Sequence, residues 1–444
     1  MSKVFLTALG CRLNEAELQR WAQEYQAIGY QVTQRADDAS VMVVNTCAVT
    51  GEAARKSRQV IRKFHRKNPA AKMVVTGCYA SLEEQQANEI LGVDLVVPNE
   101  QKDQLVAQTQ AVLDIPSMPA MATEPGAPAI FARNKERAFI KVQDGCRYRC
   151  TFCIVTVARG EEKSRTEQSI IDEINQHVAE GVQEIVIAGV HVGGYGSDID
   201  SDLYSLVKAI LAKTEIARIR FASVEPWDLP EGFFELFANP RVLPHMHLPL
   251  QSGADSVLRR MARRCKTQEF AQLVNTARTQ VPGFNVTTDI IVGFPGETEQ
   301  EFAETLAYIE SVGFGHIHIF TYSPRSGTKA ARLPGQLDNA TKKQRSQRLH
   351  QLAAQLKQQA MQAQLNQQVA VLWEGSPQVL DNGLVRFIGH TPNYHRVYVD
   401  VPAQYDLSNQ VLMTQLTRVD GEMLEGQVES AELPKTGAPI LLQS

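Results

Sequence analysis

Three cysteines lie close together at Cys146, Cys150 and Cys153, in the spacing C-x3-C-x2-C. They follow the apolar run at 139–142, so they stand just after an expected strand. A structural zinc site normally uses four ligands from two separated C-x2-C pairs, and the chain has no second such pair. Three thiolates on a four-iron cluster instead leave one iron open to a substrate. We therefore predict an iron-sulfur cluster here, and the tight spacing disfavours three reduced thiols without metal.

Three further cysteines each follow an expected strand by a few residues, at Cys11, Cys47 and Cys78. The carboxyl ends of parallel strands lie along one edge of a sheet, so these thiols should meet at one place. A single buried cysteine is more often a small core residue than a ligand. Three at equivalent strand ends indicate a second metal site, and the glycines before Cys11 and Cys78 would let the backbone approach it closely.

Composition sets wide limits. The 444 residues are 43% hydrophobic and 21% charged, which suggests a globular chain of about three domains. Seven cysteines, an odd number, fit a reducing compartment better than a disulfide framework. The net charge of -4 excludes a globally basic RNA-coating protein, so nucleic acid must be bound by local patches. No signal peptide or membrane-spanning run is evident, and we expect a cytoplasmic protein without membrane contact.

Strand and helix patterns alternate through most of the chain and predict an α/β fold. The N-terminal part reads as a parallel α/β domain, in which Thr50 caps a helix that continues to Lys67. A proline-rich linker follows from Asp114 to Asn134. Six further strand-helix repeats, with strands near 139–142, 184–188, 218–222, 245–248, 285–292 and 316–322, suggest a complete or partial parallel barrel. After a helical stretch, alternating runs from Val369 onward suggest a small antiparallel barrel.

Several polar features have a structural and a functional interpretation. His245 and His247 share one face of a strand and could ligate metal, but a hydrogen-bonded pair is favoured, as it is for His316 and His318. Cys265 is expected to be structural. The helix after Thr50 could bind phosphate or simply be solvated, because its cations have few acidic partners; these cations are Arg55, Lys56, Arg58, Arg62, Lys63, Arg66 and Lys67. The same choice, solvated or RNA-facing, applies to Arg259, Arg260, Arg263, Arg264 and Lys266.

The last barrel carries aromatic and basic residues that could line a nucleic-acid groove, although an end-cap without ligand is the alternative. They are Phe387, Tyr394, His395, Arg396 and Tyr398.

The cysteine spacing, with the aromatic Phe152 before the last cysteine, resembles the signature of the radical S-adenosylmethionine (SAM) enzymes. Over nearly its full length the chain resembles the methylthiotransferases, and within them the group that modifies threonylcarbamoyladenosine in tRNA. The motifs that carry this are Leu9 to Asn14, Asn45 to Thr50, Thr76 to Tyr79, Asp144 to Cys153, Ala158 to Gly160, Ser164-Arg165, Gly189 to His191, His247 to Gly253, Thr288 to Thr298 and Tyr322 to Thr328. Thr156 and Cys265 depart from the usual pattern, but neither is an expected ligand.

The resemblance implies a domain order. A methylthiotransferase domain with an auxiliary cluster would occupy 1–113, a linker 114–134, the radical SAM core 135–364, a TRAM-type RNA-binding barrel 365–432 and a tail 433–444. It also implies two 4Fe-4S clusters, one on Cys11, Cys47 and Cys78 and the other on Cys146, Cys150 and Cys153. No catalytic residues are expected beyond these ligands. Phe152 would lie against the SAM adenine, and Gly189, Ser223, Glu225 and Asp289 would contact its amine, carboxylate and ribose.

The implied reaction adds a methylthio group to carbon 2 of threonylcarbamoyladenosine beside the anticodon. An unactivated aromatic C–H bond leaves few polar routes to substitution, which explains the need for radical chemistry. The partners would be tRNA and a low-potential electron donor such as flavodoxin or ferredoxin. Two alternatives stay open: the same chemistry on isopentenyladenosine or on a ribosomal-protein aspartate, and a non-catalytic iron-sulfur RNA-binding sensor. The stretches Cys11 to Asn14 and Gly389 to Tyr394 favour the first substrate.

Overall fold

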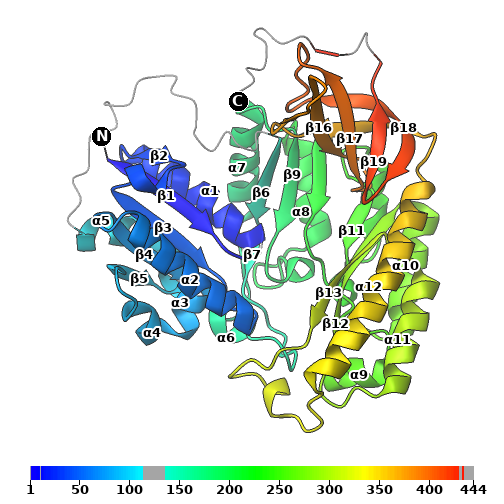
Figure 1. The fold of residues 1–444 in the computed structure, drawn as a ribbon, viewed down its shortest axis with the longest axis horizontal. Helices are drawn as coiled ribbons and strands as arrows, with labels where there is room; N and C mark the ends of the chain where they lie inside the picture. Colours follow the sequence, from blue (N-terminus) through cyan, green and yellow to red (C-terminus); the bar gives the residue numbers. More distant parts are fainter. Residues whose placement is uncertain (1, 11, 114–135, 430–432, 435–444) are drawn as a thin grey trace.

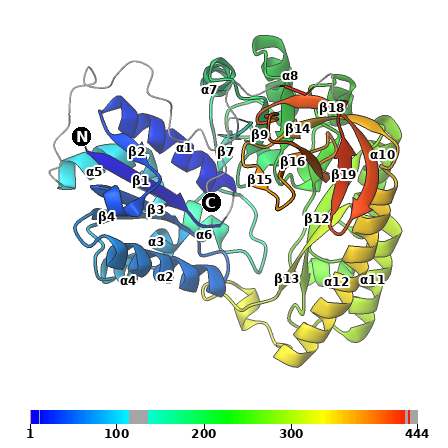
Figure 2. The same ribbon diagram turned by 45° about the horizontal axis from the view of Figure 1, so that its top comes forward.

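The computed structural model describes residues 2–10, 12–113, 136–429 and 433–434 (Figure 1). Cys11, the predicted linker and most of the predicted tail lie outside these ranges. Three parts follow one another along the chain: an N-terminal domain, an arc of parallel strands with helices outside it, and a small C-terminal domain that sits on one end of the arc (Figures 1 and 2). The α/β class and the three-part order match the prediction.

The N-terminal domain is built on a parallel sheet with the strand order β2-β1-β3-β4-β5. The strands are β1 (Lys3–Ala8), β2 (Gln31–Thr33), β3 (Val41–Thr46), β4 (Lys72–Gly77) and β5 (Leu95–Val97). The helices are α1 (Arg12–Ala27), α2 (Gly51–Lys67), α3 (Cys78–Leu82), α4 (Glu84–Asn88) and α5 (Leu105–Leu113). The predicted cap of α2 is present, because the Thr50 hydroxyl accepts a hydrogen bond from the Ala53 amide at 3.1 Å.

Six parallel strands form an open barrel. They occur as two three-stranded sheets, β10-β9-β6 and β11-β12-β13, which isolated parallel bridges join at Ile219 with Val242 and at Ser223 with His247. The strands are β6 (Arg137–Lys141), β9 (Glu184–Ala188), β10 (Arg218–Phe221), β11 (His245–His247), β12 (Asn285–Val292) and β13 (His316–Thr321). The helices are α7 (Glu167–Ala179), α8 (Leu203–Lys213), α9 (Asp255–Arg260), α10 (Thr267–Gln280), α11 (Glu299–Val312) and α12 (Asn339–Gln362). The barrel is therefore partial, one of the two predicted forms.

The C-terminal domain is a six-stranded sheet that curls on itself. Its order is β14-β18-β19-β17-β16-β15, and β14 also pairs with β16; the pairs are antiparallel except β17 with β19. The strands are β14 (Gln368–Trp373), β15 (Gln378–Val379), β16 (Leu384–His390), β17 (Arg396–Pro402), β18 (Val411–Asp420) and β19 (Met423–Gln427). Trp373 and Val397 lie in its core.

Two of the aromatic residues expected on a nucleic-acid groove are buried instead, so that part of the prediction is wrong. Phe387 is 0% exposed in the core of the domain, because its position on β16 falls on the inward face. Tyr398 is 2% exposed, covered by the Arg386 guanidinium 4.0 Å from its ring centre, and its hydroxyl donates to Asp420. Neither ring is available to stack on a base.

A buried group of charged side chains joins the N-terminal domain to the barrel, where α1 lies beside β6 (Figure 1). We call it the interdomain ion cluster; it consists of Glu17, Lys102, Lys141, Asp144 and Arg159. The Arg159 Nη1 lies 3.1 Å from a Glu17 oxygen and 3.0 Å from an Asp144 oxygen. The Lys141 ammonium lies 3.3 Å from Glu17 and 2.6 Å from Asp144, and Lys102 contacts the same two carboxylates.

Electrostatics keep both carboxylates of this cluster ionised. Burial alone would raise the pKa of Glu17, but Arg159, Lys102 and Lys141 hold it well below its usual range. The pKa of Asp144 is likewise held well below its usual range, by Arg159, Lys141 and Lys102 against the effect of burial. The side chains of Glu17 and Arg159 are only 1% and 2% exposed. Each charge therefore depends on its partners, since a buried charge without a counter-charge is very costly.

We expect Glu17→Gln to weaken this joint, because three buried cations would then share the single carboxylate of Asp144. Breaking one partner of a buried ion group typically costs about 3–5 kcal/mol. The free energy of unfolding in urea measures the loss. Glu24→Gln is the matched control on α1, because Glu24 pairs with Arg20 at a partly exposed position and the pair is worth at most about 1 kcal/mol. Equal losses in the two variants would contradict the account.

Candidate functional site

A cavity of 920 Å³ lies where the three parts of the chain meet. The N-terminal domain contributes Cys47 and Cys78 to its lining. The barrel contributes predicted SAM contacts, at Gly189, Ser223 and Asp289, and the C-terminal domain contributes Tyr394 and Arg396 among others. The strands of the N-terminal sheet and of the barrel thus direct their carboxyl ends toward one space, as expected for parallel sheets.

Cys47 follows β3 and Cys78 opens α3 directly after β4. Gly10 has φ +96°, and a Cβ at this position would lie 2.6 Å from the Cys47 sulfur, so the backbone before Cys11 passes against that thiol. Gly77 has φ +93°, and a Cβ there would lie 2.4 Å from the Thr46 carbonyl oxygen. Both glycines are therefore required by close approach between neighbouring strand ends. Cys11 itself lies outside the described residues, and its role as the third ligand stays a prediction.

Two buried asparagines tie these strand ends to the barrel. The Asn14 amide donates to the Leu9 carbonyl at 2.6 Å, and its oxygen accepts from Arg159 at 2.8 Å. The Asn99 amide donates to the Ala158 carbonyl at 2.7 Å and lies 3.8 Å from the Cys78 sulfur. Asn14 belongs to a motif noted in the sequence, but nothing in the sequence distinguished Asn99.

Cys146, Cys150 and Cys153 lie in the loop between β7 (Gln143–Asp144) and α6 (Val155–Arg159). The loop is partly exposed, and its thiols are close enough to raise one another's pKa. Burial raises the pKa of Cys146 to about 12 and that of Cys153 to about 11, so both are neutral thiols without a metal. Three thiols in one loop fit a 4Fe-4S cluster with one open iron, which would displace these protons on binding.

The loop itself is not part of the cavity lining, but Val155, immediately after it, is. Its entry turn needs glycine, because a Cβ on Gly145 (φ +69°) would lie 1.9 Å from the Glu161 carbonyl oxygen. The loop is therefore held tightly at the edge of the cavity.

A polar group missed by the sequence analysis lies behind Cys146 and centres on His191. Its Nε2 lies 2.7 Å from Asp228, and its Nδ1 contacts Glu162. Burial would lower the pKa of His191, but Asp228, Glu225 and Glu162 together raise it above its usual value. Ligand atoms of Cys146, Glu162 and His191 lie within 4.8 Å of one another. The Gly189 to His191 motif was the available signal, but it gave no role for the imidazole.

Two predicted SAM contacts lie away from the cavity lining. Glu225 is next to the His191 group, 3.8 Å from its Nε2, and burial raises the pKa of this carboxyl. Phe152 packs against an apolar group that includes Met261 and Phe294. Gly189, Ser223 and Asp289 line the cavity, whereas Glu225 lies beside the cysteine loop and Phe152 is part of it.

Six of the ten histidines line the cavity: His245, His247, His316, His318, His390 and His395. His245 Nε2 and His247 Nδ1 lie 3.1 and 2.9 Å from the Thr287 hydroxyl, which confirms the favoured hydrogen-bonded pair. His247 also lies 3.2 Å from Asp289. His247, Asp289 and His318 have ligand atoms within 4.8 Å of one another, so this spacing is also compatible with a metal ion.

Two of the basic residues near Cys265, Arg260 and Arg263, are bound to other protein groups and are not simply solvated or RNA-facing as expected. Arg260 binds Glu301 at 2.7 Å. Arg263 stacks on Trp227, reaches the Pro249 carbonyl and lies 3.9 Å from the Cys150 sulfur, so it supports the cysteine loop. Cys265 is buried, and burial raises its pKa to about 12, in agreement with a structural role.

The cations of α2 remain compatible with both interpretations. Arg58 pairs with Glu83 at 3.5 Å and Lys67 with Asp37 at 3.1 Å. The remaining cations of the run are exposed: Arg55, Lys56, Arg62, Lys63 and Arg66. An exposed face of this kind can be solvated or can contact phosphates.

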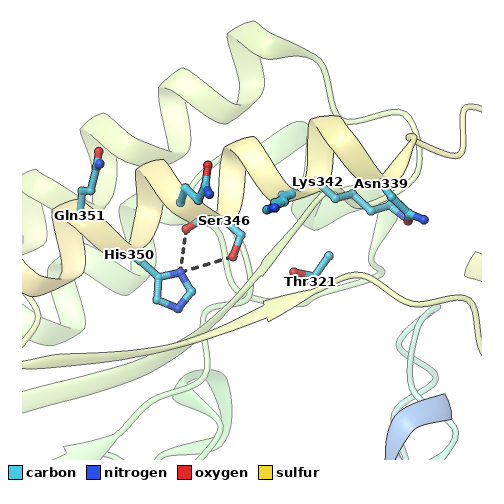
Figure 3. Close-up of a pocket in the computed structure, with 8 residues that line it drawn as sticks. Thr321, Asn339, Lys342, Ser346, His350 and Gln351 are labelled. Atoms are coloured by element: carbon cyan, nitrogen blue, oxygen red, sulfur yellow. Dashed lines mark hydrogen bonds between the residues drawn. The ribbon is translucent and has the colours of Figure 1, made fainter.

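A second hollow lies between α12 and the end of β13 (Figure 3). It is lined by polar side chains of α12, among which His350 Nδ1 lies 2.7 Å from the Ser346 carbonyl oxygen. None of the predicted site residues lines it. The candidate chemistry therefore belongs to the 920 Å³ cavity.

No helix in the described part of the chain is both long and apolar enough to cross a membrane.

Comparisons with known proteins agree with this geometry. Residues 140–309 match the Radical SAM superfamily, and residues 3–98 match the family described as Uncharacterized protein family UPF0004. The threonylcarbamoyladenosine tRNA methylthiotransferase MtaB of Bacillus subtilis (strain 168) is 34% identical over 96% of each chain. Its counterpart from Thermotoga maritima is 37% identical over 78% of this chain and 80% of the relative.

A tRNA-2-methylthio-N(6)-dimethylallyladenosine synthase from Geobacillus thermodenitrificans is 34% identical, covering 87% of this chain and 78% of that protein. Among solved structures, the radical S-adenosylmethionine methyltransferase TsrM from Kitasatospora setae shares the fold with a TM-score of 0.56 at 16% identity, over 74% of this chain and 77% of that one. With relatives this similar along almost its entire length, the chain belongs to the radical SAM methylthiotransferase family and is an enzyme of that class.

Proposed function

We propose that this enzyme adds a methylthio group to carbon 2 of threonylcarbamoyladenosine beside the anticodon of tRNA, with two 4Fe-4S clusters and SAM. One observation carries the proposal: Cys47 and Cys78 line the same cavity as the strand ends of the barrel. A sulfur held at these cysteines would face the space in which the barrel acts on its substrate.

The six cysteines would divide into two ligand sets. Cys146, Cys150 and Cys153 would hold one cluster, and Cys47 and Cys78, with Cys11, would hold the other. When bound, the first cluster would supply the electron for reductive cleavage of SAM, and the second would supply the sulfur for transfer. The chain's own residues position these parts and exclude water, which is the protein's share in cofactor chemistry.

The cavity wall offers groups for SAM. Gly189, Ser223 and Asp289 line it, and the Asp289 carboxylate suits an amine or a ribose hydroxyl. Glu225 would act from beside the cysteine loop, and Phe152 would press on the adenine from its apolar group. His191, fixed between Asp228 and Glu162, would hold the wall behind Cys146 in place.

The proposed partners are tRNA and a low-potential electron donor such as flavodoxin or ferredoxin, in the cytoplasm. The exposed cations of α2 offer phosphate contacts. The names of the first relatives favour threonylcarbamoyladenosine, whereas another relative at the same identity is named for dimethylallyladenosine. That substrate is the second candidate. The polar end of the cavity, with Tyr394 and Arg396, favours the first.

Nucleosides from the tRNA of cells with and without the gene test the substrate. Deletion should remove the methylthio form of threonylcarbamoyladenosine while its unmodified precursor accumulates, as measured by mass spectrometry. If that nucleoside is unchanged and the methylthio form of isopentenyladenosine disappears instead, the second candidate is correct and our substrate is wrong.

Because the two cysteine sets have separate roles in our proposal, substitutions in each set should abolish different activities. Cys47→Ala should abolish methylthio transfer but keep reductive cleavage of SAM, because the other three thiols are intact. Cys150→Ala should abolish both activities. Cys265→Ala is the matched control, because this thiol is buried in the hydrophobic core of the barrel and belongs to neither set, and it should keep both activities. Both activities and iron content should be measured together.

Loss of SAM cleavage in folded Cys47→Ala protein would overturn the assignment of separate roles to the two sets. An unchanged iron content in that variant would count against a cluster at Cys47.

A further inference from the structure

The end of the cavity opposite Cys47 and Cys78 is built by the barrel and the C-terminal domain together. Lys357 comes from α12, His316 from β13, and His395 and Arg396 from the turn and start of β17. Glu422 lies at the same end. We call this group the C-terminal wall. None of its residues is a predicted cluster ligand or a predicted SAM contact.

Two cations of this wall are free to meet a ligand. The Arg396 side chain is exposed and makes no ion pair or hydrogen bond with the described residues. The Lys357 ammonium lies 3.0 Å from Glu422, but the Glu422 side chain is 88% exposed. The Lys357 side chain itself is 21% exposed, and because its partner is in solvent the pair is weak and can be exchanged for another anion at little cost.

The neighbouring arginines are already engaged. Arg137 lies 2.7 Å and Arg220 3.2 Å from Glu184, and Arg218 shares the same buried carboxylate. Three guanidinium groups around one carboxylate leave this side of the cavity with an excess of positive charge. Besides Glu422, the carboxylate of Glu374 lies at this end and is bound to His390 at 3.0 Å. An incoming anion would therefore be attracted without displacing a strong ion pair.

Neutral donors complete the wall. Burial lowers the pKa of both His316 and His395 to about 4, so their imidazoles are uncharged at neutral pH. A neutral imidazole can donate one hydrogen bond to an oxygen without adding charge. The ring of Tyr394, by contrast, is enclosed between His245 and His390 at 4.7 and 4.8 Å, with Arg220 over its face, so it shapes the wall rather than stacking on a base.

The chemistry of the two candidate substrates differs most at this point. A threonine joined through its amine keeps its carboxylate, whereas a dimethylallyl group is a hydrocarbon. The exposed Arg396 guanidinium and the partly buried Lys357 ammonium suit a carboxylate, and covering them with an apolar group would cost free energy of desolvation. We propose that Arg396 and Lys357 bind the carboxylate of the threonylcarbamoyl group, and that this wall selects the substrate. This inference rests on the proposed function.

Three anticodon stem-loop RNAs test it. The first carries threonylcarbamoyladenosine. The second carries its glycine counterpart, which keeps the carboxylate and lacks the side chain. The third carries the threoninamide counterpart, which lacks the charge. Affinity by titration and kcat/KM for methylthiolation are measured for each RNA. The full-length, iron-reconstituted enzyme should favour the first two over the amide by roughly 10- to 100-fold, the range for hydrogen bonds to a charged group.

Arg396→Gln should reduce that preference toward one, and Lys357→Gln should reduce it in part, since each removes one cation from the carboxylate. Arg418→Gln is the matched control. Arg418 lies in the same domain and pairs with Glu425 at 2.8 Å, outside the cavity lining. The Arg418→Gln variant should therefore prefer the acid RNAs over the amide RNA as strongly as the natural enzyme does. Reductive SAM cleavage without RNA checks that each variant is folded and loaded.

The outcomes separate the two proposals. If the natural enzyme methylthiolates the acid and the amide equally well, the carboxylate site is wrong and the proposed function stands. If Arg396→Gln weakens all three RNAs by the same factor, Arg396 contacts the phosphate backbone and the inference is also overturned. If the natural enzyme methylthiolates none of the three RNAs but acts on a fourth stem-loop that carries dimethylallyladenosine, the proposed function fails, and the inference fails with it.

Discussion

The interdomain ion cluster is the constraint on which the arrangement of this enzyme depends. Arg159 ends the helix that follows the C-x3-C-x2-C loop, and Glu17 lies on the first helix of the N-terminal domain. Their contact, with Asp144 and two lysines, is buried and cannot shift gradually, because each charge would lose its partners. Asn14, which donates to the Thr46 carbonyl, and Asn99, which lies beside the Cys78 sulfur, extend the joint to the strand ends that carry Cys47 and Cys78. The joint therefore holds Cys47 and Cys78 in the cavity lining and the C-x3-C-x2-C loop at the cavity's edge.

The cavity shows how one fold can combine three parts into one site. Parallel strands bring their carboxyl ends together within each sheet, and the interdomain ion cluster joins the N-terminal domain to the barrel so that strand ends of both line one cavity. The C-terminal domain closes the remaining side with Tyr394 and Arg396. It was expected to bind nucleic acid through its own surface, but its position also makes it part of the cavity lining. In our proposal the domain therefore binds the threonylcarbamoyl group on the base. The exposed cations of α2 are then the better candidates for contacts with the tRNA phosphates.

Local patterns in the sequence predicted most of the elements. The six strands of the barrel and the capped helix after Thr50 occur where periodicity and capping placed them. Features that depend on tertiary contact were not predictable. The pairing of Glu17 with Arg159 spans two domains, and no local pattern identifies it. Phe387 and Tyr398 were assigned to an open groove because alternation gives the two faces of a strand but not which face is covered. Arg263 looked like part of a solvated run, and only the fold brings it to Trp227 and the Cys150 loop.

A crystal structure of the anaerobically reconstituted enzyme, with anomalous scattering recorded at the iron edge, tests the central claim most directly. The account predicts two separate iron sites in each chain, one at Cys146, Cys150 and Cys153 and one at Cys47 and Cys78, both open to the shared cavity. A single iron site, or a second one that faces away from the cavity, would contradict the joint role of the two cysteine sets.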